Sequence, residues 1–277
     1  MTRFLDNADD LALEVTRGQM LAVPPDYSGC AMAAVRGLIR RGVRDLHLLG
    51  LPQLGFQGDM LIGAGCVKTL ETAALTLGEF GPAPRFGAAI KSGAIRMRDS
   101  TCPAIHAGLQ AAEKGIPFMP LRGILGSDVL AHRSDWKILD NPFGDDDPLV
   151  VLPAIRPQAT LFHAPLADRH GNVWIGVRRE LMLAAHASRR TLVTVEEFTE
   201  ADLLGDERYA AGTIPALYIS AVAPAPGGAW PVGLAGRYAP DAAHLAEYVA
   251  LAKTEAGFRR YLDEHVLKTE TRAGVQA

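Results

Sequence analysis

A short stretch near the middle of the chain gathers the residue types that could do chemistry. It begins at Ala159 with apolar residues that lead to His163. A polar turn follows, with Asp168, His170 and Asn172, before apolar residues resume. This order is typical of two short strands joined by a turn, because Asp, Gly and Asn tolerate left-handed backbone and bond nearby amides. Since an unpaired buried polar group costs about 1–3 kcal/mol, these side chains either form a self-satisfied structural corner or line one wall of a site.

Two catalytic interpretations of the same side chains do not fit their spacing. His163, Asp168 and His170 follow no common metal-ligand motif, and no fourth ligand accompanies them. Ser28 would complete a Ser-His-Asp triad with two of them, but no G-x-S-x-G elbow supports it. We therefore predict neither a metal site nor a serine triad.

Carboxylates at two strand ends could take part in acid–base chemistry. Glu196 and Glu197 follow a β-branched strand, and alternation sends one side chain to each face, so at most one enters a site. Asp99 and Ser100 lie at a polar bend between a strand and a helix. Capping of that helix is the simpler explanation for this second pair.

A glycine-rich loop from Gly50 to Gly58 lies where a parallel sheet would expose a site. Its spacing is not the G-x-G-x-x-G of a dinucleotide-binding loop. Gln53 offers both a donor and an acceptor, so with Gly50 and Gly55 it either contacts a ligand or belongs to an ordinary strand-to-helix turn. Further along, Arg122 could hold a carboxylate or phosphate, or pair with a nearby aspartate.

Composition restricts the class of protein before any element is placed. The chain has 277 residues, of which 48% are hydrophobic and 21% charged, as expected for a globular protein with a sizeable core. A net charge of −3 gives no sign of a surface for nucleic acid or anionic membranes. An anionic ligand would therefore be bound locally, by backbone amides or single cationic side chains.

Cysteine usage and the first residues indicate a compartment. Cys30, Cys66 and Cys102 show no C-x-x-C spacing, which predicts free thiols in a reducing environment. The N-terminal segment is too acidic for a signal peptide, and no apolar run reaches the roughly 18 residues of a membrane span. We expect a cytoplasmic protein.

Strands and helices alternate along most of the chain, which is typical of a parallel sheet covered on both faces. Such a sheet binds ligands outside the carboxyl ends of its strands. We therefore predict an α/β fold with an open, mostly parallel sheet. The expected strands lie at 20–23, 45–49, 67–70, 95–98, 149–152, 159–164, 173–175 and 191–195. A turn at 115–117 leads into 118–120, and a further apolar run spans 216–222. The expected helices lie at 7–17, from Ser28 as N-cap to 41, from 59 onward, at 104–114 and 180–188, and as two helices within 241–267.

Domain organisation follows from what interrupts this alternation. Residues 122–148 read as a long loop with an acidic run, and such loops are usually functional or cover an interface. Neither a repeat nor a linker is evident, so we predict a single domain over 1–267. The tail from 268 to 277 lacks an apolar period and is expected to be disordered.

Several motifs, taken in order, resemble the larger CoA-transferase family, on the side of the A-type chain of glutaconate CoA-transferase. The similarity covers about residues 5 to 265. The motifs are Gly50-Leu51-Pro52 with Gly55, Leu61-Ile62-Gly63-Ala64-Gly65-Cys66-Val67, Gly108-Leu109-Gln110-Ala111-Ala112, Gly115-Ile116-Pro117-Phe118-Met119-Pro120 with Arg122, Gly126-Ser127, His163-Ala164, Ala167-Asp168, Gly171-Asn172, Thr194-Val195-Glu196-Glu197 and Ala225-Pro226-Gly227-Gly228.

The resemblance implies a fold, a partner and a reaction. The fold is the open α/β sheet shared by CoA transferases and sugar-phosphate isomerases. The partner is a homologous B-type subunit, which usually carries the glutamate that forms a glutamyl-CoA thioester, so that one acyl exchange becomes two easier steps. Coenzyme A is then a substrate, and no permanently bound cofactor is expected.

The same resemblance implies roles for individual residues. Gln53 and the amides around Gly50 and Gly55 are expected to stabilise the oxyanion or to hold the acyl group. The residues expected to line the acyl or carboxylate part of the pocket are Ser28, Ser100, Arg122 and Ser127. The residues expected to form the wall of the site are His163, Asp168, Asn172 and Glu197.

A second branch of the family, the two-subunit steroid-ring hydrolases, resembles this chain almost as closely. These enzymes open a cyclic ketone on a CoA thioester, and an acidic residue of the A-type chain near a strand-to-helix bend helps to activate water. Asp99 supplies one carboxylate at that bend, whereas Cys102 stands where another acidic residue is expected. The sequence therefore predicts the A-type chain of a two-subunit CoA transferase, with a ring-opening hydrolase and a non-catalytic sensor or scaffold as alternatives.

Overall fold

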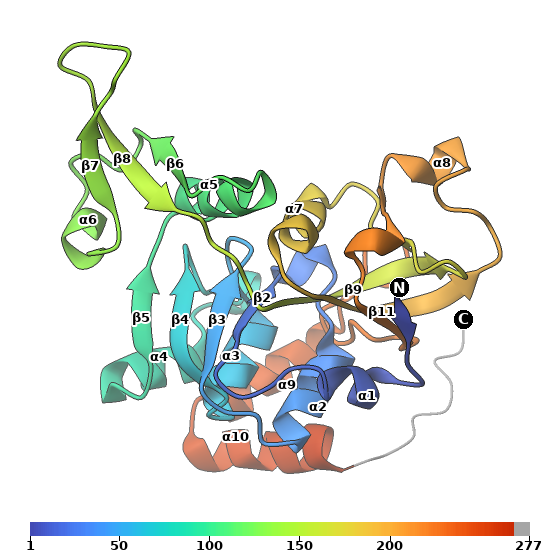
Figure 1. Cartoon of the computed structure of the whole chain (residues 1–277). Coiled ribbons are helices and arrows are strands. Elements are labelled where there is room, and N and C mark those ends of the chain that lie inside the picture. Colours follow the sequence, from blue (N-terminus) through green and yellow to red (C-terminus); the bar gives the residue numbers. More distant parts are fainter. Residues whose placement is uncertain (269–277) are drawn as a thin grey trace.

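A ten-stranded sheet forms the centre of the computed structural model, which describes residues 1–268 (Figure 1). Neighbours along its main path are all parallel, and two short strands, β10 (Val173–Trp174) and β12 (Thr213–Ile214), add to it in antiparallel fashion. The mostly parallel α/β sheet is thus confirmed. The main path runs β1 (Arg3–Phe4), β13 (Ala221–Pro224), β11 (Thr191–Thr199), β9 (Ala159–Asp168), β2 (Met20–Val23), β3 (Leu46–Gly50), β4 (Val67–Thr72) and β5 (Arg96–Asp99).

Helices cover both faces of this sheet, which explains why its central strands are buried almost continuously along their length. In β2, Leu21 and Val23 pack into the larger core, whereas Ala22 faces the opposite side with Ile105 and Leu109. The larger core is built with α1 (Ala8–Ala12), α2 (Met32–Arg40), α3 (Phe56–Gly63), α4 (Pro84–Ser92), α9 (Ala242–Ala252) and α10 (Glu255–Leu262). The opposite side is covered by α5 (Cys102–Glu113) and α7 (Arg179–Ala187).

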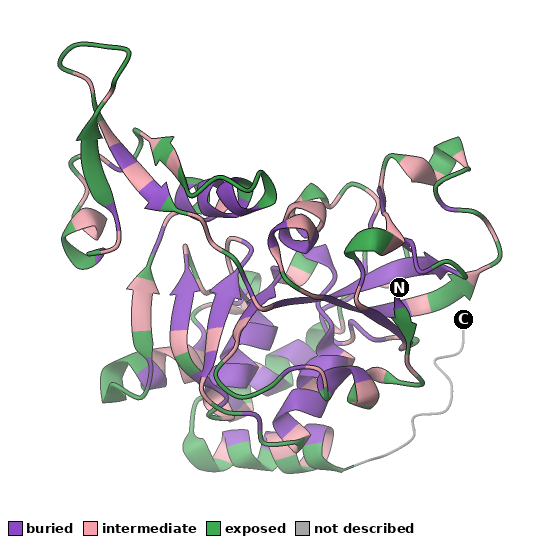
Figure 2. Ribbon diagram, in the orientation of Figure 1, coloured by how far each residue is buried: buried purple, intermediate pink, exposed green. Residues whose placement is uncertain are grey.

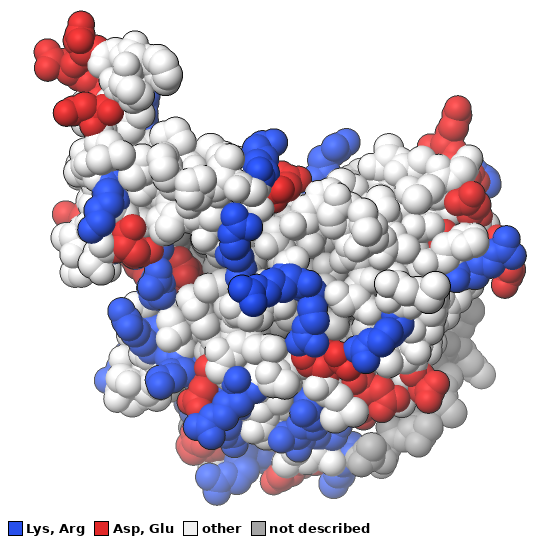
Figure 3. Space-filling model, in the orientation of Figure 1, with Lys and Arg blue, Asp and Glu red and all other residues white. Residues whose placement is uncertain are grey.

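Residues 118–153 form an arm that stands away from the main sheet (Figures 1 and 2). Its antiparallel sheet has the order β6 (Phe118–Leu121), β8 (Pro148–Pro153) and β7 (Lys137–Asp140), and α6 (Val129–His132) precedes β7. The prediction of a loop over 122–148 is therefore wrong in part. All four residues of β7 are exposed, so no burial period marked this strand in the sequence. Acidic side chains gather at the tip of the arm (Figure 3).

Several predicted boundaries differ because side chains from other segments set them. The first helix ends at Ala12 instead of continuing to 17, and Asn7 caps it by accepting from two amides. Ser28 is not an N-cap, since it lies in the 3₁₀ turn Asp26–Ser28 and α2 begins at Met32. In the run 216–222, a 3₁₀ turn at Ala216–Tyr218 precedes β13.

Three further short segments complete the described structure. They are α8 (Glu207–Ala210), the 3₁₀ turn Gly78–Phe80 and the π-helical segment Asp263–Leu267. The predicted disordered tail lies, except for Lys268, outside the described residues. The three cysteines are free, with Cys30 and Cys66 buried and Cys102 exposed. Over residues 1–268, none of the helices has the length and hydrophobicity needed to cross a bilayer.

A buried carboxylate connects the C-terminal helices to the core. Asp59 on α3 is fully buried and accepts hydrogen bonds from the Tyr248 hydroxyl and the Phe86 amide, both at 2.7 Å. Desolvation raises the pKa of Asp59 above its ordinary value, although these bonds oppose the shift. The position of α9 over α3 therefore depends on a carboxylate that needs both donors.

Replacement of Tyr248 by Phe removes one of these donors. We expect the free energy of unfolding to fall by about 1–3 kcal/mol, because the buried carboxylate loses a partner. Urea unfolding at neutral pH measures the change, and Tyr218→Phe, at a partly exposed tyrosine, is the matched control. Equal stability of the two variants would contradict the role assigned to the Asp59–Tyr248 bond.

Candidate active site at the carboxyl edge of the sheet

A cleft of about 350 Å³ opens beyond the carboxyl ends of β2, β3 and β4. Its lining comes from the segments that follow these strands, namely 25–27, 53–56 and 76–80, together with Val232, Pro240 and Leu245. Parallel strands that lie side by side end at one edge, so segments distant in the sequence meet there. This is the location predicted for the site.

Gln53 and Gly55 line this cleft, whereas Gly50 is not among its lining residues. The side-chain amide of Gln53 donates to the Tyr27 hydroxyl at 2.9 Å. Gly50 is buried, and a Cβ there would meet the Thr72 hydroxyl at 2.6 Å. Of the three predicted residues of the glycine-rich loop, two therefore reach the cleft and one is required for packing.

Asp26 is a carboxylate of this cleft that the sequence did not indicate. Both of its oxygens accept from the Phe56 amide, at 3.0 and 3.1 Å, so it holds the first turn of α3. The position of Gly55 cannot take a Cβ, because that atom would overlap the Asp26 carboxylate. This contact also explains why α3 begins at Phe56 and not at Asp59. Desolvation raises the pKa of Asp26 to about 6.

A second hollow, of about 330 Å³, is also lined by Tyr27. Ser28 and His163 contribute to its lining, with Trp174 and Arg178. The buried Ser28 hydroxyl donates to the Glu180 carboxylate at 2.5 Å. Tyr27 lines both spaces, so the cleft beside Gln53 and the hollow beside His163 border one residue.

His163 belongs to a buried hydrogen-bonded chain. Its Nδ1 lies 2.8 Å from the Thr194 hydroxyl and its Nε2 2.6 Å from the Glu196 carboxylate. Glu196 also accepts from the Tyr238 hydroxyl at 2.6 Å and from the Gly227 amide at 2.8 Å. Partial burial opposes ionisation of Glu196, but these hydrogen bonds outweigh it and hold its pKa below the ordinary value.

The neighbouring carboxylate lies on the other face of β11. Glu197 is exposed and pairs with Arg237 at 2.7 Å. The two carboxylates thus lie on opposite faces, as alternation predicts, and Glu197 is not among the residues that line the clefts around Tyr27. β11 continues to Thr199, two residues beyond Glu197, and this register directs Glu196 to His163.

Asp168 and Asn172 form the structural corner rather than a wall. One oxygen of Asp168 accepts from the amides of His170 and Asn172, and the other accepts from the Asn172 side chain at 2.7 Å. The Asn172 side-chain oxygen in turn accepts from the Ala216 amide at 2.8 Å. Both side chains are buried, and their partners are the turn itself and the backbone amides of Leu203 and Ala216, as the corner alternative expects.

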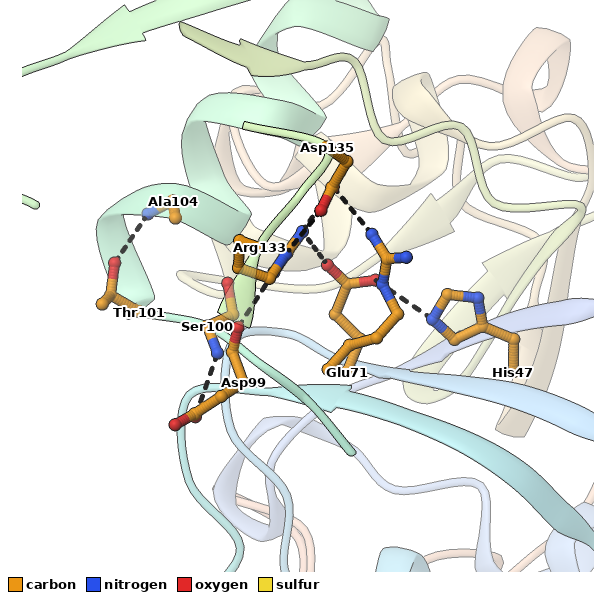
Figure 4. Close-up of polar contacts among 9 residues, drawn as sticks. His47, Glu71, Asp99, Ser100, Thr101, Ala104, Arg133 and Asp135 are labelled. Atoms are coloured by element: carbon orange, nitrogen blue, oxygen red, sulfur yellow. Dashed lines mark hydrogen bonds and ion pairs between the residues drawn. The ribbon is translucent and has the colours of Figure 1, made fainter. Parts of the chain in front are cut away.

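The bend after β5 rests on a buried charge network centred on Glu71 (Figure 4). Glu71, at the end of β4, receives hydrogen bonds from Arg133 at 2.9 Å and Arg98 at 3.1 Å, and His47 lies 3.0 Å away. Asp135 pairs with both arginines. Although burial opposes it, these partners keep the pKa of Glu71 below its ordinary value of 4.5.

This network fixes the backbone at the predicted Asp99–Ser100 bend. Arg133 donates to the Asp99 carbonyl at 2.9 Å, and the Asp99 side chain accepts from the Ser100 amide at 3.1 Å. Ser100 is buried and lines a small cavity of about 110 Å³ together with Glu71. The N-cap of α5 is Thr101, so neither Asp99 nor Ser100 caps the helix.

Two predicted pocket residues lie in the arm. Arg122 is mostly exposed and forms a bidentate pair with Asp147, and the Ser127 hydroxyl accepts from the Val129 amide. Neither residue is among those that line the clefts around Tyr27. For Arg122 the structure thus shows the pairing with a nearby aspartate.

Removal of the Glu71 charge tests the network. Glu71→Gln leaves Arg133 buried without its full counter-charge, so we expect a loss of about 3–5 kcal/mol in the free energy of unfolding at pH 7. Because the folded pKa is lowered, this contribution exists above pH 4.5 and disappears as the pH falls through the folded value. Urea unfolding at pH 7 and pH 3 measures both effects, with exposed Glu79→Gln as control. A difference of constant size at both pH values would contradict this account.

Comparison with known proteins identifies the family of the chain. The sequence model of the family described as Coenzyme A transferase matches residues 6–225. The A-type chain of the 3-oxoadipate CoA-transferase of Pseudomonas knackmussii is 32% identical, over 99% of this chain and 94% of its own length. The IpdA chain of a cholesterol ring-cleaving hydrolase of Mycobacterium tuberculosis is 31% identical, over 86% of this chain and 84% of its own length.

A solved structure supports the same family. Glutaconate coenzyme A-transferase from Acidaminococcus fermentans superimposes with a TM-score of 0.86 at 26% identity, covering 96% of this chain and 89% of that one. The chain therefore belongs to the coenzyme A transferase family, as the resemblance implied.

Proposed function

We propose that the chain is the A-type half of a two-subunit enzyme that moves CoA between an acyl-CoA and a carboxylate. The observation that carries this proposal is the similarity to the A-type chain of a transferase along almost the whole of both sequences. The cleft at the carboxyl edge supports it, because it combines an apolar lining with few polar groups, as acyl pockets require. Coenzyme A enters as a substrate, and the enzyme works in the cytoplasm.

The chemistry is divided between the two chains. A glutamate of the B-type partner attacks the thioester carbonyl and expels the CoA thiolate, which then returns to the glutamyl carbonyl and releases the first acid. The resulting glutamyl-CoA thioester passes CoA to the second carboxylate by the reverse sequence. The chain described here holds the acyl group beside Tyr27. The side-chain amide of Gln53 is the hydrogen-bond donor that we assign to the oxyanion.

The arm supports the need for a partner. Its strand β7 exposes Ile138 and Leu139, which are 57% and 50% accessible, and Phe143 beyond it is 95% accessible. Apolar side chains gathered on one projecting element mark an interaction surface. We propose that the B-type partner binds this surface. Arg122 and Ser127 then belong to the segment that positions the arm.

The partner requirement is tested with the purified chain and a B-type partner, whose gene we expect beside this one. We expect CoA exchange between an acyl-CoA and acetate only when both proteins are present, since the nucleophile is on the partner. Exchange of CoA by this chain alone would contradict the proposal. An inert pair that binds acyl-CoA tightly would favour the sensor.

Substitution in the arm separates assembly from chemistry. We expect the double variant Ile138→Ser/Leu139→Ser to weaken association with the B-type partner at least tenfold, because each buried leucine-sized side chain contributes about 1.5–3 kcal/mol. Analytical ultracentrifugation measures the dissociation constant. The exposed Leu217→Ser, outside the arm, is the control. Unchanged association of the double variant would place the partner elsewhere.

A second candidate function, a CoA-thioester hydrolase, is favoured by the similarity to the ring-cleaving hydrolase and by the Asp99 carboxylate at the bend. In that enzyme Asp99 would help to activate water, so Asp99→Asn should lower kcat by about 10²–10⁴-fold. In the transferase the same variant should leave exchange nearly unchanged, because Asn retains the acceptor for the Ser100 amide. Turnover of the reconstituted pair in heavy water, with Asp128→Asn as control, distinguishes the two reactions.

A further inference from the structure

Three side chains with metal-binding groups converge where the C-terminal helices meet, apart from the proposed active site. His244 and Glu247 lie one turn apart on α9 and so project from the same side of the helix. His265 comes from the π-helical segment that follows α10. Such π-helical turns are rare and often occur at functional sites.

The distances among these groups fit a small metal ion. His244 Nδ1 and His265 Nε2 each lie 3.7 Å from a different oxygen of Glu247. The three potential ligand atoms all lie within 4.8 Å of one another. Bonds of about 2.0–2.1 Å in a tetrahedral site require ligand atoms roughly 3.4 Å apart, so small side-chain rotations would suffice.

A hydrogen bond to the other ring nitrogen orients the first histidine. His244 is buried, and its Nε2 lies 2.8 Å from the Tyr261 hydroxyl. When Nε2–H donates to that oxygen, Nδ1 carries the lone pair that faces Glu247. The His244 ring also packs on Trp230, with ring centroids 4.2 Å apart.

The second histidine presents an unsatisfied nitrogen. Among the residues that the structure describes, the buried Nε2 atom of His265 has no hydrogen-bond partner, although the carboxylate of Glu247 lies only 3.7 Å away. A buried polar atom without a partner carries an energetic cost, and a bound ion would remove it. This observation is independent of the spacing of the three ligands.

We propose that His244, Glu247 and His265 bind one divalent transition-metal ion, with Zn²⁺ the preferred occupant and solvent as the fourth ligand. Two neutral imidazoles and one carboxylate form a donor set typical of zinc. The Glu247 side chain is 45% accessible, so an ion can enter from solvent. The bound ion connects α9 to the segment after α10 and holds the end of the described chain against the core.

The test uses the full chain after treatment with a chelator. Zinc chloride is titrated by calorimetry, and cobalt chloride is titrated by visible absorption, which reports tetrahedral coordination by nitrogen. We expect one equivalent of metal, a raised midpoint of thermal unfolding, and at least tenfold weaker binding in Glu247→Gln and His265→Gln. Because Glu247 is partly exposed, its variant should fold, and circular dichroism without metal confirms this.

Controls separate this site from other ligands in the chain. His106→Gln, on α5, and Cys102→Ser, at the exposed thiol, should bind the metal as the unsubstituted chain does. Metal binding that survives Glu247→Gln and His265→Gln but is lost in Cys102→Ser would overturn the proposal. So would the absence of binding, which would leave the three residues as an ionic and aromatic cluster.

Discussion

Parallel pairing of β2, β3, β4 and β5 is the constraint on which the rest of the site depends. Strands that run side by side in one direction must end at the same edge of the sheet. The segments that follow them are therefore packed closely together. The close approach of Asp26 to Gly55, and of the Glu71 network to the Asp99 carbonyl, are consequences of this crowding. Each contact joins the ends of different strands.

Two carboxylates at this edge, Glu71 and Glu196, are each held by several partners. Glu71 meets two arginines and a histidine, and Glu196 meets His163, Tyr238 and a backbone amide. Neither Glu71 nor Glu196 lines the cleft beside Gln53. The lining of that cleft includes a different carboxylate, Asp26. The charged groups thus shape the loops, while the cleft proposed to hold the acyl group stays largely apolar. This suits the proposed reaction, in which the nucleophile comes from another chain.

The strands, and the carboxyl edge of the sheet as the place of the site, could be predicted because each strand is marked by residues close together in the sequence. Apolar runs and glycines identified β2, β3 and β4, and the order of motifs identified the family. The Glu71–Arg133 pair was not predictable in this way, since its members are 62 positions apart and no motif joins them. Asp26 was equally hidden, because its role depends on a glycine from a different loop, and β7 was missed because it buries no residue.

The arm leaves and rejoins the body of the protein at one place, since Phe118 lies opposite Pro153 in its small sheet. An insertion with adjacent ends can lengthen, shorten or be replaced during evolution without altering the register of the main sheet. If the arm binds the B-type partner, as proposed, partner choice can diverge while the main sheet keeps its register. Exchange of the arm between relatives is then the simplest route by which such a protein could acquire a different partner subunit.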